Sequence, residues 1–365
     1  MSGYGARMVM RQEFRLRLRA GRWRWLLGTW VLVLLVITAL LVAAADSAFR
    51  DVQIADDRPV PLGPTVFGFL MLFLLALALL VVPALTAQSI NGDRDRGTLA
   101  MVQVTLLAPV EIALGKFLAS WGTALVFLAA SFPVVGWAVA LGGVGVVRAL
   151  AVLGVVAVLL GVVAALSLAL SALLARTTTS AVLAYLTVFA LVVGTLVVFG
   201  LVTTTTTETR PVTYTEPVWD DPLRADYDAQ GDPINPDRFE TRTYDETVLH
   251  TERVWWLLAP NPFVILADAA PGLPAVIDSR TGRAVDPGGL EPLGEIKYAV
   301  RAARAGPDDS PRSAGGWLPR EPDRGLAVWP WGLGFDVLLA SGALWVTTRR
   351  LRTPTRTLPR GTRVA

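Results

Sequence analysis

Long runs without a charged side chain constrain this sequence more than any other feature. Five runs of about 20 residues or more carry no charge, and a sixth contains only Asp336. A helix of ~20 apolar residues crosses the ~30 Å hydrocarbon core of a bilayer. Charged residues make up only 17% of the chain, against about 25% in soluble domains. We therefore expect an all-α polytopic membrane protein with six transmembrane helices, at 26–45, 65–87, 117–141, 149–175, 181–202 and 326–348.

The segment before the first run, residues 1–25, is strongly basic. Arg11 and Arg15 are one helical turn apart, and Phe14 lies in an apolar row at the same spacing. This pattern is typical of an amphipathic helix on an anionic membrane surface. A disordered basic tail is the alternative. A secretory signal is less compatible with the run at 26–45, because a signal core has only ~7–15 apolar residues.

The distribution of charge predicts the orientation of the spans. Residues 203–328 hold 21 acidic and 13 basic side chains, whereas the rest of the chain holds 9 acidic and 20 basic ones. Basic segments stay on the cytoplasmic side of a membrane. We therefore expect a multi-pass protein of the plasma membrane, with both termini inside, including the basic tail 349–365, and with the region 203–325 outside.

The outer region 203–325 has a mixed pattern. Residues 254–274 are apolar but are interrupted by four prolines, so interfacial or re-entrant helices fit better than a seventh span. Residues 213–218, 241–244 and 247–254 alternate as strands do. We expect either a small cap that is part β or a partly ordered loop.

The sequence lacks the residues that several classes of chemistry require. The chain has no cysteine and a single histidine, His250, so no metal site is expected. The only Gly-Lys pair, Gly115-Lys116, lacks the other residues of a phosphate-binding loop. We expect no catalytic residue, no cofactor and no nucleic acid, because the basic segments are explained by topology.

Asp336 is the one acidic residue inside a predicted span. A carboxylate within a membrane is costly and marks a functional candidate. The alternative is that Trp331 marks the membrane interface and that Asp336, just below it, is wetted by headgroups or by a cavity.

The polar segment 88–116 separates the second run from the third. Asp93, Arg94, Asp95 and Arg96 offer charges of both signs to a partner. Gly97 permits a sharp turn, Thr98 is a candidate helix cap, and Leu99 begins an apolar helical face. An ordinary solvated loop is the alternative.

The order of motifs in this segment resembles type-2 ABC exporter permeases. The matching residues are Asp93-Arg-Asp-Arg-Gly-Thr-Leu99, then Ala108-Pro109, then Glu111-Ile112 and Gly115-Lys116. Arg11-Gln-Glu13-Phe-Arg15 is similar to the elbow helix of that family, and Pro260-Asn-Pro-Phe263 to its segment between the last two helices. Asp93 and Asp95 depart from the glutamates that are commoner there.

This resemblance implies a permease subunit without its own ATPase site. Its partners would be an ATP-binding cassette ATPase, which binds ATP and Mg, and a second permease subunit in a homo- or heterodimer. Docking and coupling would fall on residues 93–99, Glu111 and Lys116. Two rivals stay open: a membrane-anchored sensor or adaptor that acts through its outer region, and a membrane-embedded enzyme, which the lone histidine and the lack of clustered acids disfavour.

Overall fold

The computed structural model describes most of the chain. The described residues are 3–19, 22–49, 53–54, 58–59, 61–97, 108–218, 238–273, 276–277, 284–285, 291–307, 312–313 and 325–352. Thr98 and Leu99, named above as cap and apolar face, lie outside these ranges, as does nearly all of the basic tail.

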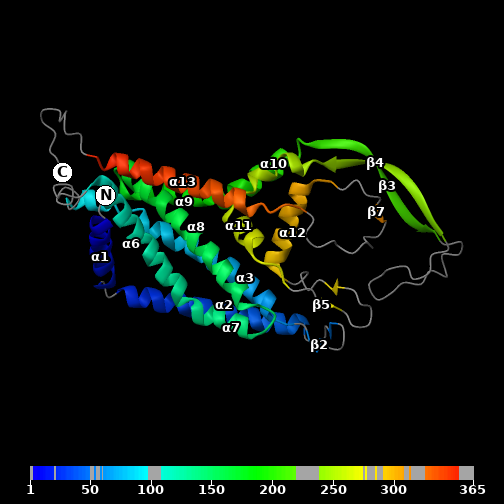
Figure 1. Cartoon of the computed structure of the whole chain (residues 1–365), viewed down its shortest axis with the longest axis horizontal. Helices are drawn as coiled ribbons and strands as arrows, with labels where there is room; N and C mark the ends of the chain where they lie inside the picture. Colours follow the sequence, from blue (N-terminus) through cyan, green and yellow to red (C-terminus); the bar gives the residue numbers. More distant parts are fainter. Residues whose placement is uncertain are drawn as a thin grey trace.

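The described chain is mostly helical (Figure 1). Its α-helices are α1 (Gly3–Arg19), α2 (Arg22–Phe49), α3 (Gly63–Thr86), α4 (Asn91–Asp95), α6 (Pro109–Ala130), α7 (Phe132–Ala140), α8 (Val146–Leu173), α9 (Thr177–Phe189), α10 (Thr195–Thr203), α11 (Pro262–Ala269), α12 (Pro292–Ala305) and α13 (Trp329–Arg350). A π-helical segment, Ala190–Gly194, joins α9 to α10. The strands are β1 (Gln53–Ile54), β2 (Arg58–Pro59), β3 (Thr207–Val218), β4 (Arg238–Leu249), β5 (Val276–Ile277), β6 (Ala284–Val285) and β7 (Arg312–Ser313).

Five helical stretches are long and apolar enough to cross a membrane. They are Trp23–Ala48, Gly63–Asp95, Pro109–Ala140, Val146–Leu173 and Thr177–Thr203. The apolar part of the second stretch ends with α3, and the polar segment follows it. Five of the predicted spans are therefore confirmed as apolar helices of sufficient length. The sixth, α13, is a continuous helix but is not among them, because Asp336, Pro330 and three tryptophans lower its mean hydropathy. Its crossing of the membrane stays a prediction.

The elements divide between two ends of the helical bundle. Helix α1 and the last turn of α13 lie at one end, which we call the elbow end (Figure 1). Strands β3 and β4 and helix α12 lie at the other, which we call the hairpin end. Helices α3, α6, α8 and α13 run between the two ends.

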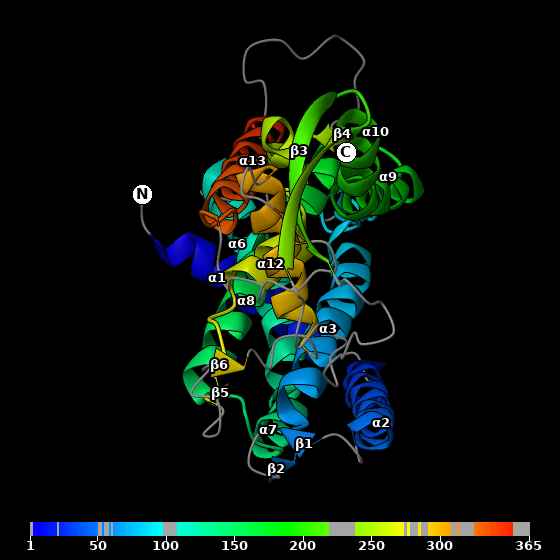
Figure 2. The ribbon, with the colours of Figure 1, turned by 90° about the vertical axis from the view of Figure 1, so that its right-hand side faces the viewer.

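Helices α3 and α8 form the centre of the bundle. Over half of the apolar window of each is buried, 56% in α3 and 61% in α8, against only 6% in α9–α10. Small residues such as Ala164, Ala165 and Ser167 lie on the buried surface of α8, and small side chains allow neighbouring backbones to come close. Figure 2 shows α2 and α9 apart from each other at the periphery of the bundle.

The third predicted span is interrupted at its proline. Helix α6 ends at Ala130 and α7 begins at Phe132, with Pro133 in its first turn. The hydroxyl of Ser131 donates to the carbonyl oxygen of Phe127 at 3.0 Å and accepts the indole N–H of Trp30 at 2.9 Å. The break is thus satisfied by side chains of the bundle, as expected where proline interrupts a buried helix.

The hairpin end combines a β-hairpin with two helices. Strands β3 and β4 pair antiparallel from Thr207↔Leu249 to Val218↔Arg238, and β7 pairs with β3 in parallel. The apolar segment after the hairpin forms short 3-10 turns and the eight-residue helix α11, which is too short to cross a membrane. Helix α12, which we did not expect from the sequence, packs on α11 and on α3.

Candidate functional site

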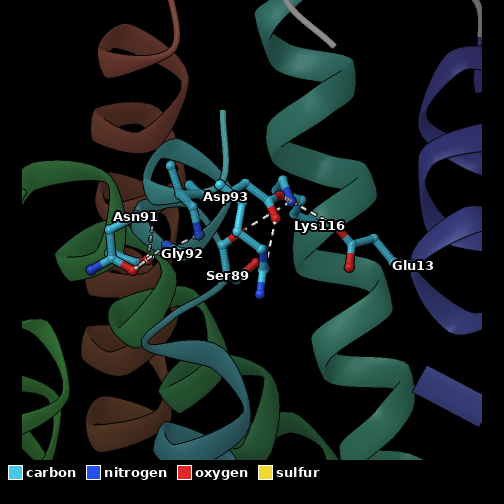
Figure 3. A network of polar contacts seen from close by, with 9 residues as sticks. Glu13, Ser89, Asn91, Gly92, Asp93 and Lys116 are labelled. Atoms are coloured by element: carbon cyan, nitrogen blue, oxygen red, sulfur yellow. Dashed lines mark hydrogen bonds and ion pairs between the residues drawn. The ribbon is translucent and has the colours of Figure 1, made fainter. Parts of the chain in front are cut away.

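A buried lysine lies at the elbow end, where three helices meet. The ammonium group of Lys116, in α6, donates to Oε1 of Glu13 in α1 at 2.6 Å and to Oδ2 of Asp93 in α4 (Figure 3). It also donates to the carbonyl oxygen of Ser89 at 3.0 Å. The Lys116 side chain is only 3% exposed. All three hydrogen atoms of the ammonium group thus have an acceptor, which a buried charge requires.

The start of α6 fixes the place of this lysine. Pro109 occupies the first turn, where a missing N–H costs nothing. A carboxylate oxygen of Glu111 accepts the backbone N–H of Ala108 at 3.1 Å and so satisfies a donor that the helix leaves free. Glu111 therefore anchors the beginning of α6, and Lys116 follows in the next turn, facing α1 and α4.

The acids around Lys116 outnumber it, and a second cation contributes. Arg96 bonds Oδ1 of Asp93 at 3.0 Å, one turn along the polar segment. Burial alone would raise the pKa of the Asp93 carboxyl. The charge of Lys116 and the hydrogen bonds from Lys116 and Arg96 outweigh this effect, and the pKa of Asp93 is lowered. Asp93 is therefore a carboxylate at neutral pH, and it holds α4 against α6 through an ion pair.

A second anchor joins the polar segment to α8. The hydroxyl of Ser171 accepts the backbone N–H groups of Ile90 and Asn91, at 3.0 and 3.2 Å, and donates to Oδ1 of Asn91 at 3.0 Å. The hydroxyl of Ser180, at the start of α9, donates to the carbonyl oxygen of Ala87 at 2.8 Å. Asn91 and Ser171 are fully buried. The short helix α4 is thus tied to α6 and α1 on one side and to α8 on the other, and the turn before it is tied to α9.

The elbow helix α1 packs along α6 through two glycines. An added methyl group at Gly115 would lie 2.6 Å from Cβ of Val9, and one at Gly122 would lie 2.9 Å from the ring of Phe14. Phe14 therefore packs against a protein helix. Arg11 and Arg15 are exposed on the face of α1 that is turned away from α6. The expected amphipathic helix exists, but its buried face contacts α6.

The structure separates the predicted coupling residues into two groups. Asp95, Arg96 and Gly97 are exposed, Arg94 is half-buried, and Gly97 has a φ of 70° as expected for a turn. Glu111 and Lys116 are buried and bind within the chain. Of the predicted coupling residues that the structure describes, the exposed group is the one that can form a surface for a partner.

Sequence reasoning missed three members of this site: Glu13, Asn91 and Ser171. Glu13 carried a signal, because it is the only acid in the basic segment 1–25. Ser171 carried none, because nothing in the sequence pattern distinguishes it from Ser167 in the same apolar run.

Two further ion pairs are buried at the hairpin end. Arg148, at the start of α8, bonds Oε2 of Glu291 at 2.9 Å, and Glu291 caps α12 through the N–H groups of Leu293 and Gly294. Burial raises the pKa of Glu291, and the opposing charge of Arg148 and these hydrogen bonds do not fully cancel it. Asp268 of α11 accepts from Arg301 at 2.6 Å.

Among the residues that the structure describes, no group of three or more acidic or histidine side chains could hold a metal ion. His250 lies between Glu208, at 3.1 Å, and Glu252, at 2.7 Å, on opposite ring nitrogens. Asp336 is 1% exposed, so other parts of the chain cover its side chain; its depth in a membrane stays a prediction.

A comparison with models of known protein families finds no match to this chain, and neither does a comparison with curated protein sequences.

Proposed function

We propose that this chain is a membrane-spanning permease subunit of an ATP-binding cassette exporter, a transporter that moves its substrate out of the cell. A separate ATPase subunit would bind ATP and Mg and dock at the elbow end, which we place in the cytoplasm. A second permease subunit would complete the pathway. The sequence resemblance of residues 90–116 supports this proposal, and so do the five apolar helices.

The observation that carries the proposal is the set of contacts around Lys116. A short helix with an exposed charged end, α4, is held by Lys116 to α6 and α1, and by Ser171 to α8. A force applied to the exposed end therefore acts on several apolar helices at once. A solvated loop would need neither a buried lysine nor a buried asparagine, since burying polar groups costs free energy unless they are paired.

The mechanism follows from these contacts. The ATPase would bind the exposed residues Asp95, Arg96 and Gly97. Closure of the ATPases on ATP would displace α4, and the Asp93–Lys116 pair would transmit the displacement to α6. Rigid packed helices respond to such a displacement by changing between discrete arrangements, here open to the inside or to the outside.

Site-directed cross-linking tests the docking surface. Because the chain has no cysteine, a single Arg96→Cys variant carries the only thiol to which a cross-linker can attach. We expect cross-linking in native membranes to join this position to an ATP-binding cassette ATPase, identified by mass spectrometry. Thr209→Cys, at the hairpin end, is the matched control and should give no such product.

The coupling is tested in reconstituted complexes of the two subunits. We expect Lys116→Met to keep ATPase binding but to reduce the ATP-dependent change in transport or in substrate-stimulated ATP hydrolysis. Unchanged coupling would contradict the role of Lys116. Cross-linking of Arg96→Cys to a kinase or another regulator would favour the alternative, a membrane-anchored sensor or adaptor.

A further inference from the structure

The acidic residue inside α13 points into the bundle. Gly332, Asp336, Ala343 and Thr347 are the buried residues of this helix around Asp336, and their spacing places them on one face. Trp331, Phe335 and Leu338 lie on the exposed face, at 64%, 47% and 72%. Asp336 is therefore turned away from the surface on which lipid would lie.

The neighbours of this face define a joint between three helices. Gly332, one turn before Asp336, packs against the carbonyl group of Ala259 and the side chain of Ile265 in α11. Ala343, two turns after it, belongs to one buried cluster with Ala165 and Ala169 of α8. Asp336 thus lies where α13 leaves the short helix α11 and meets the small-residue surface of α8.

The Asp336 carboxyl group has no partner among the described residues of this joint. Both of its oxygens are buried without a hydrogen bond among the residues that the structure describes. The charged residues on the helices packed against α13 are engaged elsewhere: Arg148 of α8 bonds Glu291, Asp268 of α11 bonds Arg301, and Lys116 of α6 bonds Glu13 and Asp93. Glu111 of α6 binds the N–H of Ala108, and Arg349 and Arg350 of α13 lie in its last turn.

An ionised carboxylate is very costly at such a place, because no cation or hydrogen-bond donor among the described residues offsets the loss of hydration. A protonated carboxyl group is neutral and costs far less. We propose that Asp336 is a proton-binding site, which holds its proton while α8, α11 and α13 are packed together and releases it when this joint opens to water.

This inference goes beyond the proposed function, because it does not depend on an ATPase. It predicts that opening of the bundle is coupled to proton release, so that a high proton concentration favours the packed arrangement. A lysine or arginine in contact with Asp336 would instead have indicated a structural ion pair, such as those of Asp268 and Glu291.

The pH dependence of stability tests the proposal on the purified full chain. Above the ordinary range of an aspartate, unfolding releases the proton, so the stability of the wild type falls as pH rises. Asp336→Asn is a neutral isostere that has no proton to release. We expect the Tm of the wild type to fall relative to that of Asp336→Asn, by on the order of a few degrees per pH unit. A difference that is constant with pH would overturn the proposal.

Chemical labelling of the wild type gives a second test that needs no variant to fold. Dicyclohexylcarbodiimide is apolar and reacts with protonated carboxyl groups, taking up their proton as the carboxyl oxygen adds to its carbon. We expect mass spectrometry to find label on Asp336 in acidic buffer and progressively less as pH rises. Asp268 is the internal control, since it is buried but paired with Arg301. No label on Asp336, or label that does not change with pH, would contradict the proposal.

Discussion

Lys116 shows at the residue scale how one buried charge can determine the arrangement of several helices. A lysine in the first turns of an apolar helix is usually solvated or reaches the membrane interface. Here the carboxylates of two other helices and one carbonyl oxygen bind it instead. The free energy of this arrangement depends on all three partners, because an unpaired group among them would be left partly desolvated.

Replacement of Lys116 by methionine removes the ammonium group and keeps much of the side-chain volume. Glu13 and Asp93, at 23% and 21% exposed, would then repel each other without a cation between them. We expect the free energy of unfolding to fall by about 1–3 kcal/mol, measured as a lower Tm in detergent. Arg96→Ala is the control: its side chain is 69% exposed, so we expect a change within about 0.5 kcal/mol. Equal effects of the two variants would contradict the central position of Lys116.

At the scale of elements, the contact of α1 with α6 depends on close approach. Val9 and the backbone of Ala6 lie where a side chain at Gly115 would have to fit. Neither a Cβ atom nor a backbone oxygen can move aside without moving the whole helix. The elbow helix is therefore held in place by the absence of a side chain on α6, together with the Glu13–Lys116 ion pair.

Gly115→Ala should displace the elbow helix. The added methyl group would lie 2.6 Å from Cβ of Val9 and 2.9 Å from the carbonyl oxygen of Ala6. We expect this overpacking to lower the free energy of unfolding by about 1–3 kcal/mol. Limited trypsin digestion measures the displacement, because Arg11 and Arg15 become better substrates as α1 leaves α6. In Gly28→Ala the new methyl group meets nothing within 4 Å, and alanine favours the helix by about 0.5–1 kcal/mol. Similar rates of cleavage in both variants would refute the close contact.

The elements differ in how well the sequence predicted them. The apolar runs predicted six membrane helices, and five of them are found with sufficient length and hydropathy, because these two properties are all that a helix needs to lie in lipid. Helix α12 was missed, although Leu293, Ile296 and Val300 have helical spacing, because prolines and glycines surround it. The partners of α1 and α4 could not be predicted, since they depend on which helices become neighbours in space.

At the scale of the whole molecule, the two ends of the helical bundle differ both in their charge and in the elements that form them. The elbow end carries α1 with its exposed arginines, and the hairpin end carries the acidic region with β3 and β4 (Figure 1). Five apolar helices between α1 and β3 are each long enough to cross a membrane, and an odd number of crossings would put these two ends on opposite sides of it. Basic segments remain in the cytoplasm, so we infer that the hairpin end is the outer one.

Cysteine labelling in intact cells tests this orientation directly, since the native chain contributes no thiol. Tyr244→Cys, in β4, replaces a side chain that is 45% exposed, and we expect a membrane-impermeant maleimide to label it in intact cells. Arg96→Cys should be labelled only after the cells are permeabilised. Both substituted positions are exposed, so the two thiols should be labelled at similar rates once the membrane is permeabilised. Labelling of Arg96→Cys in intact cells would show that the orientation is the opposite of the one inferred. It would also contradict the cytoplasmic docking surface on which the proposed function depends.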